Sequence, residues 1–145
     1  MHFVREGGAA FVLVAITLWV QCGGMAILIR VARAYVAHAA KGLRPWTAAV
    51  MMVRFSGFII VLHLLEILIW AGFYRWQVFP SWETGFYFSA ASYSTVGYGD
   101  IVLPIFWRSL GPLEAVVGIL MCGMSVSALF VIATQLVAAE SKLTR

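Results

Sequence analysis

Six consecutive residues have the types and spacing that would bind a bare cation: Thr95, Val96, Gly97, Tyr98, Gly99 and Asp100. Glycine adopts positive φ without a steric cost, so Gly97 and Gly99 allow the backbone to alternate between its two hands along this run. Such alternation turns successive carbonyl oxygens toward one axis. Those carbonyls, together with the Thr95 hydroxyl, can replace the water shell of a cation. The run therefore predicts cation coordination by backbone oxygens rather than covalent chemistry.

A short helix is expected to hold this run in place. Ser81 is a good N-cap residue, and Glu83 would lie in the positively polarised first turn. A helix over residues 81–92 would extend about 18 Å, too short to cross a hydrocarbon core of about 30 Å. We therefore predict a re-entrant helix that enters the membrane between two full spans and stops partway.

The composition requires a membrane as the solvent for most of the 145 residues. Hydrophobic residues make up 63% of the chain and charged residues 11%, against about half and about a quarter in soluble domains. So few charges exclude a soluble enzyme, a disordered chain and a free nucleic-acid binder. The net charge of +4 does not indicate a nucleic-acid partner, because the basic residues are scattered at the ends of apolar runs.

Three apolar runs are long enough to span a bilayer: residues 7–29, 55–74 and 109–139. The third would extend about 46 Å, so it must tilt or project beyond the membrane. The first run is expected to be uniformly apolar and to pack outside the other elements, against lipid. Four aromatic residues flank the second run and are expected at the two membrane interfaces: Trp46, Trp70, Tyr74 and Trp76.

Basic residues set the expected orientation. They gather after the first run and in the C-terminal tail, as Arg30, Arg33, Lys41, Arg44, Lys142 and Arg145. The positive-inside rule then places the linker and the C-terminus in the cytoplasm and the N-terminus outside. Gly42 and Pro45 are expected to end one helix and begin the next. An alternative interpretation, a signal peptide cleaved near residues 37–39, would need an apolar region longer than the usual one.

The run from Thr95 to Asp100, placed after a short helix and between two spans, resembles the TVGYGD selectivity filter of prokaryotic potassium channel pore subunits. The resemblance extends from about residue 55 to 135 and leaves the first span outside it. It implies an all-α membrane protein that forms a homotetramer, because one chain supplies one of the four strands of a filter. It also implies a multi-pass plasma-membrane protein that conducts K⁺ across the lipid bilayer, with no cofactor, nucleic-acid partner or enzyme activity.

The resemblance divides the chain into three parts. Residues 1–47 would form an N-terminal transmembrane helix and a cytoplasmic linker, residues 48–140 the pore domain, and residues 141–145 a cytoplasmic tail. Within the pore domain we expect the outer helix at 48–74, the pore helix at 81–92, the filter at 95–100 and the inner helix at 109–139.

The same resemblance assigns roles to the filter residues. The K⁺-binding residues would be Thr95, Val96, Gly97, Tyr98 and Gly99, with Asp100 at the outer mouth. The carbonyls of the first four and the Thr95 hydroxyl would form the ion sites. The side chains of Val96 and Tyr98 would then point away from the pore, and Tyr98 would pack on aromatic residues of the pore helix.

The chain departs from the family pattern beside the filter. Many members carry two tryptophans at the positions of Tyr87 and Phe88, and one of these hydrogen-bonds the filter aspartate. Tyr87 can still donate to Asp100, whereas Phe88 has no donor; plain packing is the alternative interpretation for both. Some bacterial members carry a glutamate where this chain has Ala91, so no carboxylate pair with Asp100 is expected here.

Two carboxylates lie inside the predicted spans. Glu66 and Glu114 are both near the outer end, and we expect them to touch the back of the pore helix or its first turn. His63 lies three residues before Glu66, on the same helix face. We interpret these groups as buried hydrogen-bond anchors with a modulatory role, and a pH sensor is the alternative. A metal site is not expected, because the pair lacks a third ligand.

Small residues along the inner helix have two interpretations. Gly118 or Gly123 would be a gating hinge by the resemblance, or either could simply let helices approach closely. Ser127, one turn past Gly123, is expected to line the water-filled cavity below the filter. The spacing of Arg30 and Arg33 resembles the start of a voltage sensor, but two basic residues at a cytoplasmic boundary are too few for one.

Two other classes of function fit a small apolar membrane protein. A non-conducting or regulatory subunit could keep the filter motif, although it would have no need of two glycines and a threonine there. A small efflux transporter would carry charges near the membrane midplane, whereas Glu66 and Glu114 lie near the outer end. Cys22 and Cys122 lie within apolar runs and are expected to be apolar fillers rather than a disulfide.

Overall fold

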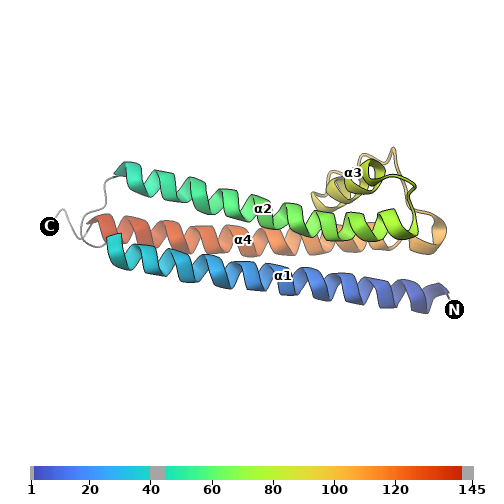
Figure 1. Ribbon diagram of the computed structural model, residues 1–145, viewed down its shortest axis with the longest axis horizontal. Coiled ribbons are helices and arrows are strands. Elements are labelled where there is room, and N and C mark those ends of the chain that lie inside the picture. Colours follow the sequence, from blue (N-terminus) through green and yellow to red (C-terminus); the bar gives the residue numbers. More distant parts are fainter. Residues whose placement is uncertain (1, 40–44, 142–145) are drawn as a thin grey trace.

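The chain folds as a bundle of three long helices with a short helix beside it (Figure 1). The computed structural model describes residues 2–39 and 45–141. Its elements are α1 (His2–Ala39), α2 (Pro45–Gln77), α3 (Trp82–Tyr93), the 3₁₀ turn η1 (Ile105–Trp107) and α4 (Leu110–Ser141). These residues contain no strand, which confirms the all-α prediction.

Three helices are long and apolar enough to cross a membrane. By length and composition the candidate spans are Arg5–Ala37, Trp46–Gln77 and Ile105–Ala138. The first two extend beyond their apolar runs at both ends, and the third begins four residues before its run and ends one residue before the run does. Pro45 begins α2 as expected. Gly42 lies outside the described residues, as do Lys41, Arg44 and the basic residues of the tail.

The surface of the bundle is apolar, as a bilayer requires. Phe11, Trp19 and Phe130 belong to a large set of hydrophobic side chains that are more than half exposed. Inside, α1, α2 and α4 pack against each other through a cluster of Met25, Leu28, Phe55, Ile59, Leu62, Ile132, Leu136 and their neighbours. A second cluster, which includes Leu13, Trp70, Tyr74, Phe88, Leu103 and Leu110, joins α3 to the bundle.

The short helix lies where α1 begins and α2 ends, packed against α2 and α4 (Figure 1). Its start follows the expected rule: the Ser81 hydroxyl accepts from the Thr84 N–H at 3.1 Å, and Glu83 lies in the first turn. It ends at Tyr93, one residue later than predicted. Close packing of α3 on α2 depends on Gly85, because a Cβ there would lie 3.1 Å from the Ala71 carbonyl oxygen.

The expectation for the aromatic residues flanking α2 was half wrong. Trp46 and Trp76 are about four-fifths exposed, as interfacial residues would be, but Trp70 and Tyr74 have no exposed surface. Both side chains can be buried because the indole N–H of Trp70 and the hydroxyl of Tyr74 each have a hydrogen-bond acceptor inside the protein. The Trp70 indole donates to the Thr17 hydroxyl at 3.0 Å, and the Tyr74 hydroxyl donates to a carboxylate of α4 at 2.8 Å.

Candidate functional site

In the filter segment, residues 95–100, the backbone alternates between positive and negative φ. Thr95, Gly97 and Gly99 have φ of 62°, 53° and 77°, and no other described residue has positive φ. The prediction for the two glycines is confirmed. Positive φ at Thr95 was not predicted, because β-branched residues rarely adopt it and it costs about 1–3 kcal/mol. The sign of φ therefore changes at every residue from 95 to 99.

Hydrogen bonds to the last turn of α3 hold the start of the filter segment. The Thr95 N–H donates to the Ser92 carbonyl at 2.9 Å, and the Gly97 N–H donates to the Ala91 carbonyl at 3.0 Å. These bonds provide the restraint that a strained threonine needs. They also fix the first residues of the filter segment relative to α3, so a shift of that helix would move the filter.

Tyr87 supports the far end of the filter segment. Its hydroxyl donates to Asp100 Oδ2 at 2.9 Å, and its ring stacks on Tyr98 with centroids 6.3 Å apart and planes 11° apart. Both contacts were expected and are confirmed. The hydrogen bond to the carboxylate raises the pKa of the Tyr87 phenol above its usual value, because it stabilises the protonated form.

Phe88 has a different role from its neighbour. It is buried on the side of α3 that faces α2, where its ring packs edge-on against Tyr74 with centroids 5.0 Å apart and also contacts Phe79 with centroids 5.6 Å apart. Tyr87 thus touches the filter segment, while Phe88 fixes α3 to α2. Of the two expected support residues, Tyr87 hydrogen-bonds and stacks on the filter segment, whereas the rings that Phe88 packs against are those of Tyr74 and Phe79.

The fully buried carboxylate of Glu114 joins three helices. Its Oε1 lies 2.5 Å from the Ser89 hydroxyl of α3, and its Oε2 accepts from the Tyr74 hydroxyl of α2 at 2.8 Å. The Ser89 hydroxyl is also 2.9 Å from the Ile67 carbonyl. The expectation that this carboxylate touches the pore helix is confirmed. It does so from α4, so α2, α3 and α4 share one buried polar centre.

A second buried carboxylate lies one level deeper in the bundle. Glu66 accepts through Oε2 from the Tyr93 hydroxyl at the end of α3, and His63 Nδ1 lies 3.4 Å from the same oxygen. His63 Nδ1 also lies 2.8 Å from the Tyr93 hydroxyl. The expected contact with the pore helix is again confirmed. The described residues hold no group of three or more His, Cys, Asp or Glu side chains placed to bind a metal.

The two inner-helix glycines have different surroundings. A Cβ at Gly118 would overlap the carbonyl oxygen of Tyr93 and lie 3.0 Å from its carbonyl carbon. At Gly123 a Cβ would meet nothing within 4 Å. Gly118 is therefore a close-packing residue, since it lets α4 touch the end of α3. Packing within one chain gives no reason for a glycine at 123.

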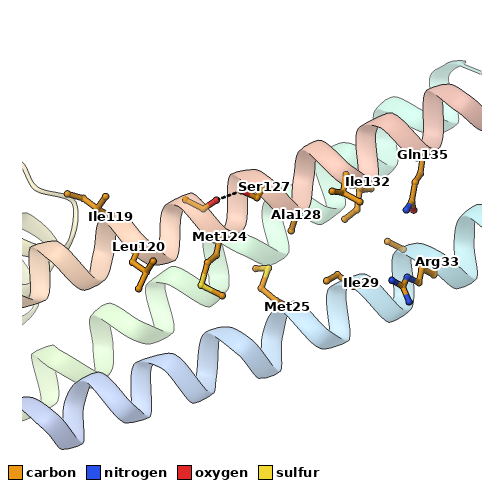
Figure 2. Close-up of a pocket in the computed structure, with 13 residues that line it drawn as sticks. Met25, Ile29, Arg33, Ile119, Leu120, Met124, Ser127, Ala128, Ile132 and Gln135 are labelled. Atoms are coloured by element: carbon orange, nitrogen blue, oxygen red, sulfur yellow. Dashed lines mark hydrogen bonds between the residues drawn. The ribbon is translucent and has the colours of Figure 1, made fainter.

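Ser127 lies on the wall of a groove between α1 and α4 (Figure 2). Its hydroxyl donates to the Gly123 carbonyl at 2.9 Å. The groove has a volume of about 730 Å³, and Met25 and Met124 point toward one another across it (Figure 2). Arg33 lines it as well, away from the filter segment. Within one chain, Ser127 thus lies beside α1.

The structure adds residues that the sequence interpretation missed, chiefly on α1. Thr17 and Gln21 have no exposed surface, and both bond to other helices. At the outer end, Glu6 Oε1 accepts from the Ser109 N–H at 3.2 Å, just before α4 begins. The first span is therefore not uniformly apolar where it packs. A buried amide inside an uncharged run was the available signal, because polar side chains there usually bond across helices.

Comparison with known proteins places the chain in a class. Residues 60–135 match the model of a family described as "Ion channel", and this match covers more than half of the chain. The chain therefore belongs to that ion channel family, and it is a multi-pass membrane protein rather than an enzyme. The matched region includes most of α2, all of α3, the filter segment and α4 as far as Gln135, and it leaves out α1. No curated protein and no solved structure shows significant similarity to the chain.

Proposed function

We propose that four copies of this chain form a potassium-selective channel in the plasma membrane. The observation that carries the proposal is the alternation of backbone hand at Thr95, Gly97 and Gly99. This conformation turns carbonyl oxygens in register toward one axis, and oxygens from several chains are needed to replace the water shell of an ion. Val96 and Tyr98 are more than half exposed in the single chain, which leaves surface for neighbouring chains to cover.

The other site residues take roles in this channel. Thr95 to Gly99 bind the permeant K⁺, and Asp100 at the outer mouth is held by Tyr87. The C-terminal end of α3 points its negative dipole toward the ion path. Gly123 is the hinge of the inner helix, and Ser127 lines the cavity once four chains are together. The N-terminus lies outside the cell and the C-terminus in the cytoplasm.

Selectivity is tested with the purified full-length chain in liposomes, under opposing K⁺ and Na⁺ gradients. The reversal potential is expected near the K⁺ equilibrium value. A value midway between those of the two ions would overturn K⁺ selectivity. No current from intact tetramers would instead indicate a non-conducting subunit.

Substitutions at two glycines test whether positive φ in the filter segment is required for selective conduction. Gly99→Ala should abolish selective conduction, because alanine resists a φ of 77° although a Cβ there has free space within the chain. Gly57→Ala is the matched control, since a Cβ at this helical glycine also meets nothing within 4 Å. Gly57→Ala should conduct as the unaltered chain does. Equal selectivity in Gly99→Ala would contradict the proposed filter.

A further inference from the structure

A buried amide links the first span to the inner helix. Gln21 Nε2 lies 2.9 Å from the Met121 carbonyl oxygen and 2.9 Å from the Ser125 hydroxyl. A carboxamide has two N–H groups, so this one nitrogen can donate both bonds. Gln21 has no exposed surface, and Ser125 almost none. The two partners lie on either side of Gly123 in the sequence of α4, where a Cβ would meet nothing within 4 Å.

The contacts continue from Ser125 to the end of the pore helix. The Ser125 hydroxyl lies 3.1 Å from His63 Nε2, and His63 Nδ1 lies 2.8 Å from the Tyr93 hydroxyl. The Tyr93 hydroxyl donates to Glu66. One arrangement of protons gives every bond of this series a donor and an acceptor, while Gln21 Oε1 and Glu66 Oε1 stay buried without a hydrogen-bond partner among the described residues. Gln21 donates to Ser125, Ser125 to His63 Nε2, the neutral imidazole through Nδ1–H to Tyr93, and Tyr93 to the carboxylate.

The last members of the series lie directly against the filter segment. Tyr93 is the final residue of α3 and stands two residues before the strained Thr95. Its ring packs on His63 with centroids 5.8 Å apart, and its backbone carbonyl fits against Gly118 of α4. Any displacement of the Tyr93 side chain is thus passed to the turn that sets the start of the filter segment.

We propose that Gln21 is a positioning residue of the channel, by which α1 fixes both the Gly123 region of α4 and, through Ser125, His63 and Tyr93, the start of the filter segment. The proposal rests on the proposed function and adds a role for the one span that the family match leaves out. Without the amide, Ser125 and the Met121 carbonyl lose their partner on α1, and α4 is free to bend. Gln21 therefore sets how often the pore is open, without touching the ion.

The test compares single-channel records of Gln21→Leu and Cys22→Ala. Leucine keeps the apolar bulk of the side chain and removes both donors, whereas Cys22 is an exposed neighbour on α1 with no hydrogen bond assigned to it. Gln21→Leu should change the open probability about threefold to tenfold and leave the unitary conductance and the K⁺/Na⁺ permeability ratio unchanged. Cys22→Ala should change none of these. An unchanged open probability in Gln21→Leu tetramers would overturn the proposal.

A double-mutant cycle separates coupling from simple loss of packing. Gln21 and Tyr93 share no direct hydrogen bond among the described residues, so independent effects of Gln21→Leu and Tyr93→Phe on the ratio of open to closed probability would multiply. If the series connects them, the double variant should resemble the stronger single variant instead. Multiplicative effects would overturn the proposal.

Two outcomes keep this test distinct from that of the proposed function. If the unaltered chain does not conduct K⁺ selectively, the proposed function fails, whatever Gln21 does. If native mass spectrometry shows that Gln21→Leu does not form tetramers, Ser125→Ala is measured in its place. It interrupts the same series of hydrogen bonds, from Gln21 to Glu66, by removing one hydroxyl. An open probability equal to that of the unaltered chain in Ser125→Ala would then overturn the role of Gln21.

Discussion

Glu114 shows how a single residue can position α3, a helix too short to be stable without contacts to its neighbours. Its two oxygens contact hydroxyls of α2 and α3 from a position on α4 with no exposed surface. In an apolar interior, a hydroxyl without a partner costs more than its hydrogen bond contributes when made. The carboxylate therefore stabilises the junction of the three helices mainly by giving the Tyr74 hydroxyl an acceptor, since the Ser89 hydroxyl also has the Ile67 carbonyl at 2.9 Å. Tyr87 acts similarly at the far end of the filter segment, where its hydroxyl donates to Asp100.

Two substitutions at Glu114 should differ in their effect on stability. Glu114→Leu should destabilise the protein by about 1–3 kcal/mol, since the Tyr74 hydroxyl loses its acceptor. Glu114→Gln should cost less. Its amide oxygen can accept from Tyr74 and its amide can donate to Ser89, whose own hydrogen can turn to the Ile67 carbonyl 2.9 Å away. Thermal unfolding of the detergent-solubilised protein measures both. Equal midpoints for the two variants would contradict this account.

At the scale of the elements, the inner helix has two distinct regions. Near Gly118 it touches the end of α3 so closely that no side chain fits. Around Gly123 it has free space, and its support comes from Gln21 of α1 through the bonds to Met121 and Ser125. The upper part of α4 is therefore packed against the end of α3. In the proposed channel, Gly123 would let the lower part of α4 bend relative to the upper part, as a gating helix requires.

Alanine at each inner-helix glycine should distinguish packing from hinge. Gly118→Ala should destabilise the protein by about 1–3 kcal/mol, because the new methyl overlaps the Tyr93 carbonyl. Gly123→Ala should stabilise the helix by about 0.5–1 kcal/mol and lower the open probability, because alanine stiffens an unobstructed helical position. Unfolding midpoints and single-channel records test the pair. The hinge assignment fails if Gly123→Ala opens and closes as the unaltered channel does.

At the scale of the whole molecule, α1 is an integral part of the bundle rather than an appendage. It contacts both α2 and α4, and its Glu6, Thr17 and Gln21 bond at three levels along its length. Its other face exposes Phe11 and Trp19, which suits contact with lipid tails. The proposed tetramer would thus surround the pore with α4, brace it with α2, and place α1 where it can still reach α4.

Removal of α1 should leave a conducting pore with altered gating. A chain that begins after Arg30 keeps every residue of the family match. Native mass spectrometry should show four chains, and the unitary conductance should equal that of the full chain, while the open probability changes. A changed conductance in intact tetramers would place α1 on the ion path instead. If the intact mass of the protein purified after expression of the full sequence corresponds to a chain that begins near Ala40, the first span is removed as a signal peptide.

The sequence alone was enough to predict features that depend on neighbouring residues. Glycines at 97 and 99 predict positive φ, Ser81 predicts the start of α3, and run lengths predict three spans, because backbone freedom, capping and apolar length are all local properties. The contact of Tyr87 with Asp100 could also be predicted from the sequence, since a short turn after α3 brings the filter segment back beside that helix.

Only the tertiary structure decided which faces of the long helices meet. These helices are apolar on every side, so no stripe in the sequence shows which side turns inward. That rotation determined that Trp70 and Tyr74 are buried, that Gly118 rather than Gly123 is closely packed, and that Gln21 reaches α4. The left-handed φ of Thr95 also had to be seen in the structure, because bonds to the last turn of α3 maintain it against the preference of a β-branched residue.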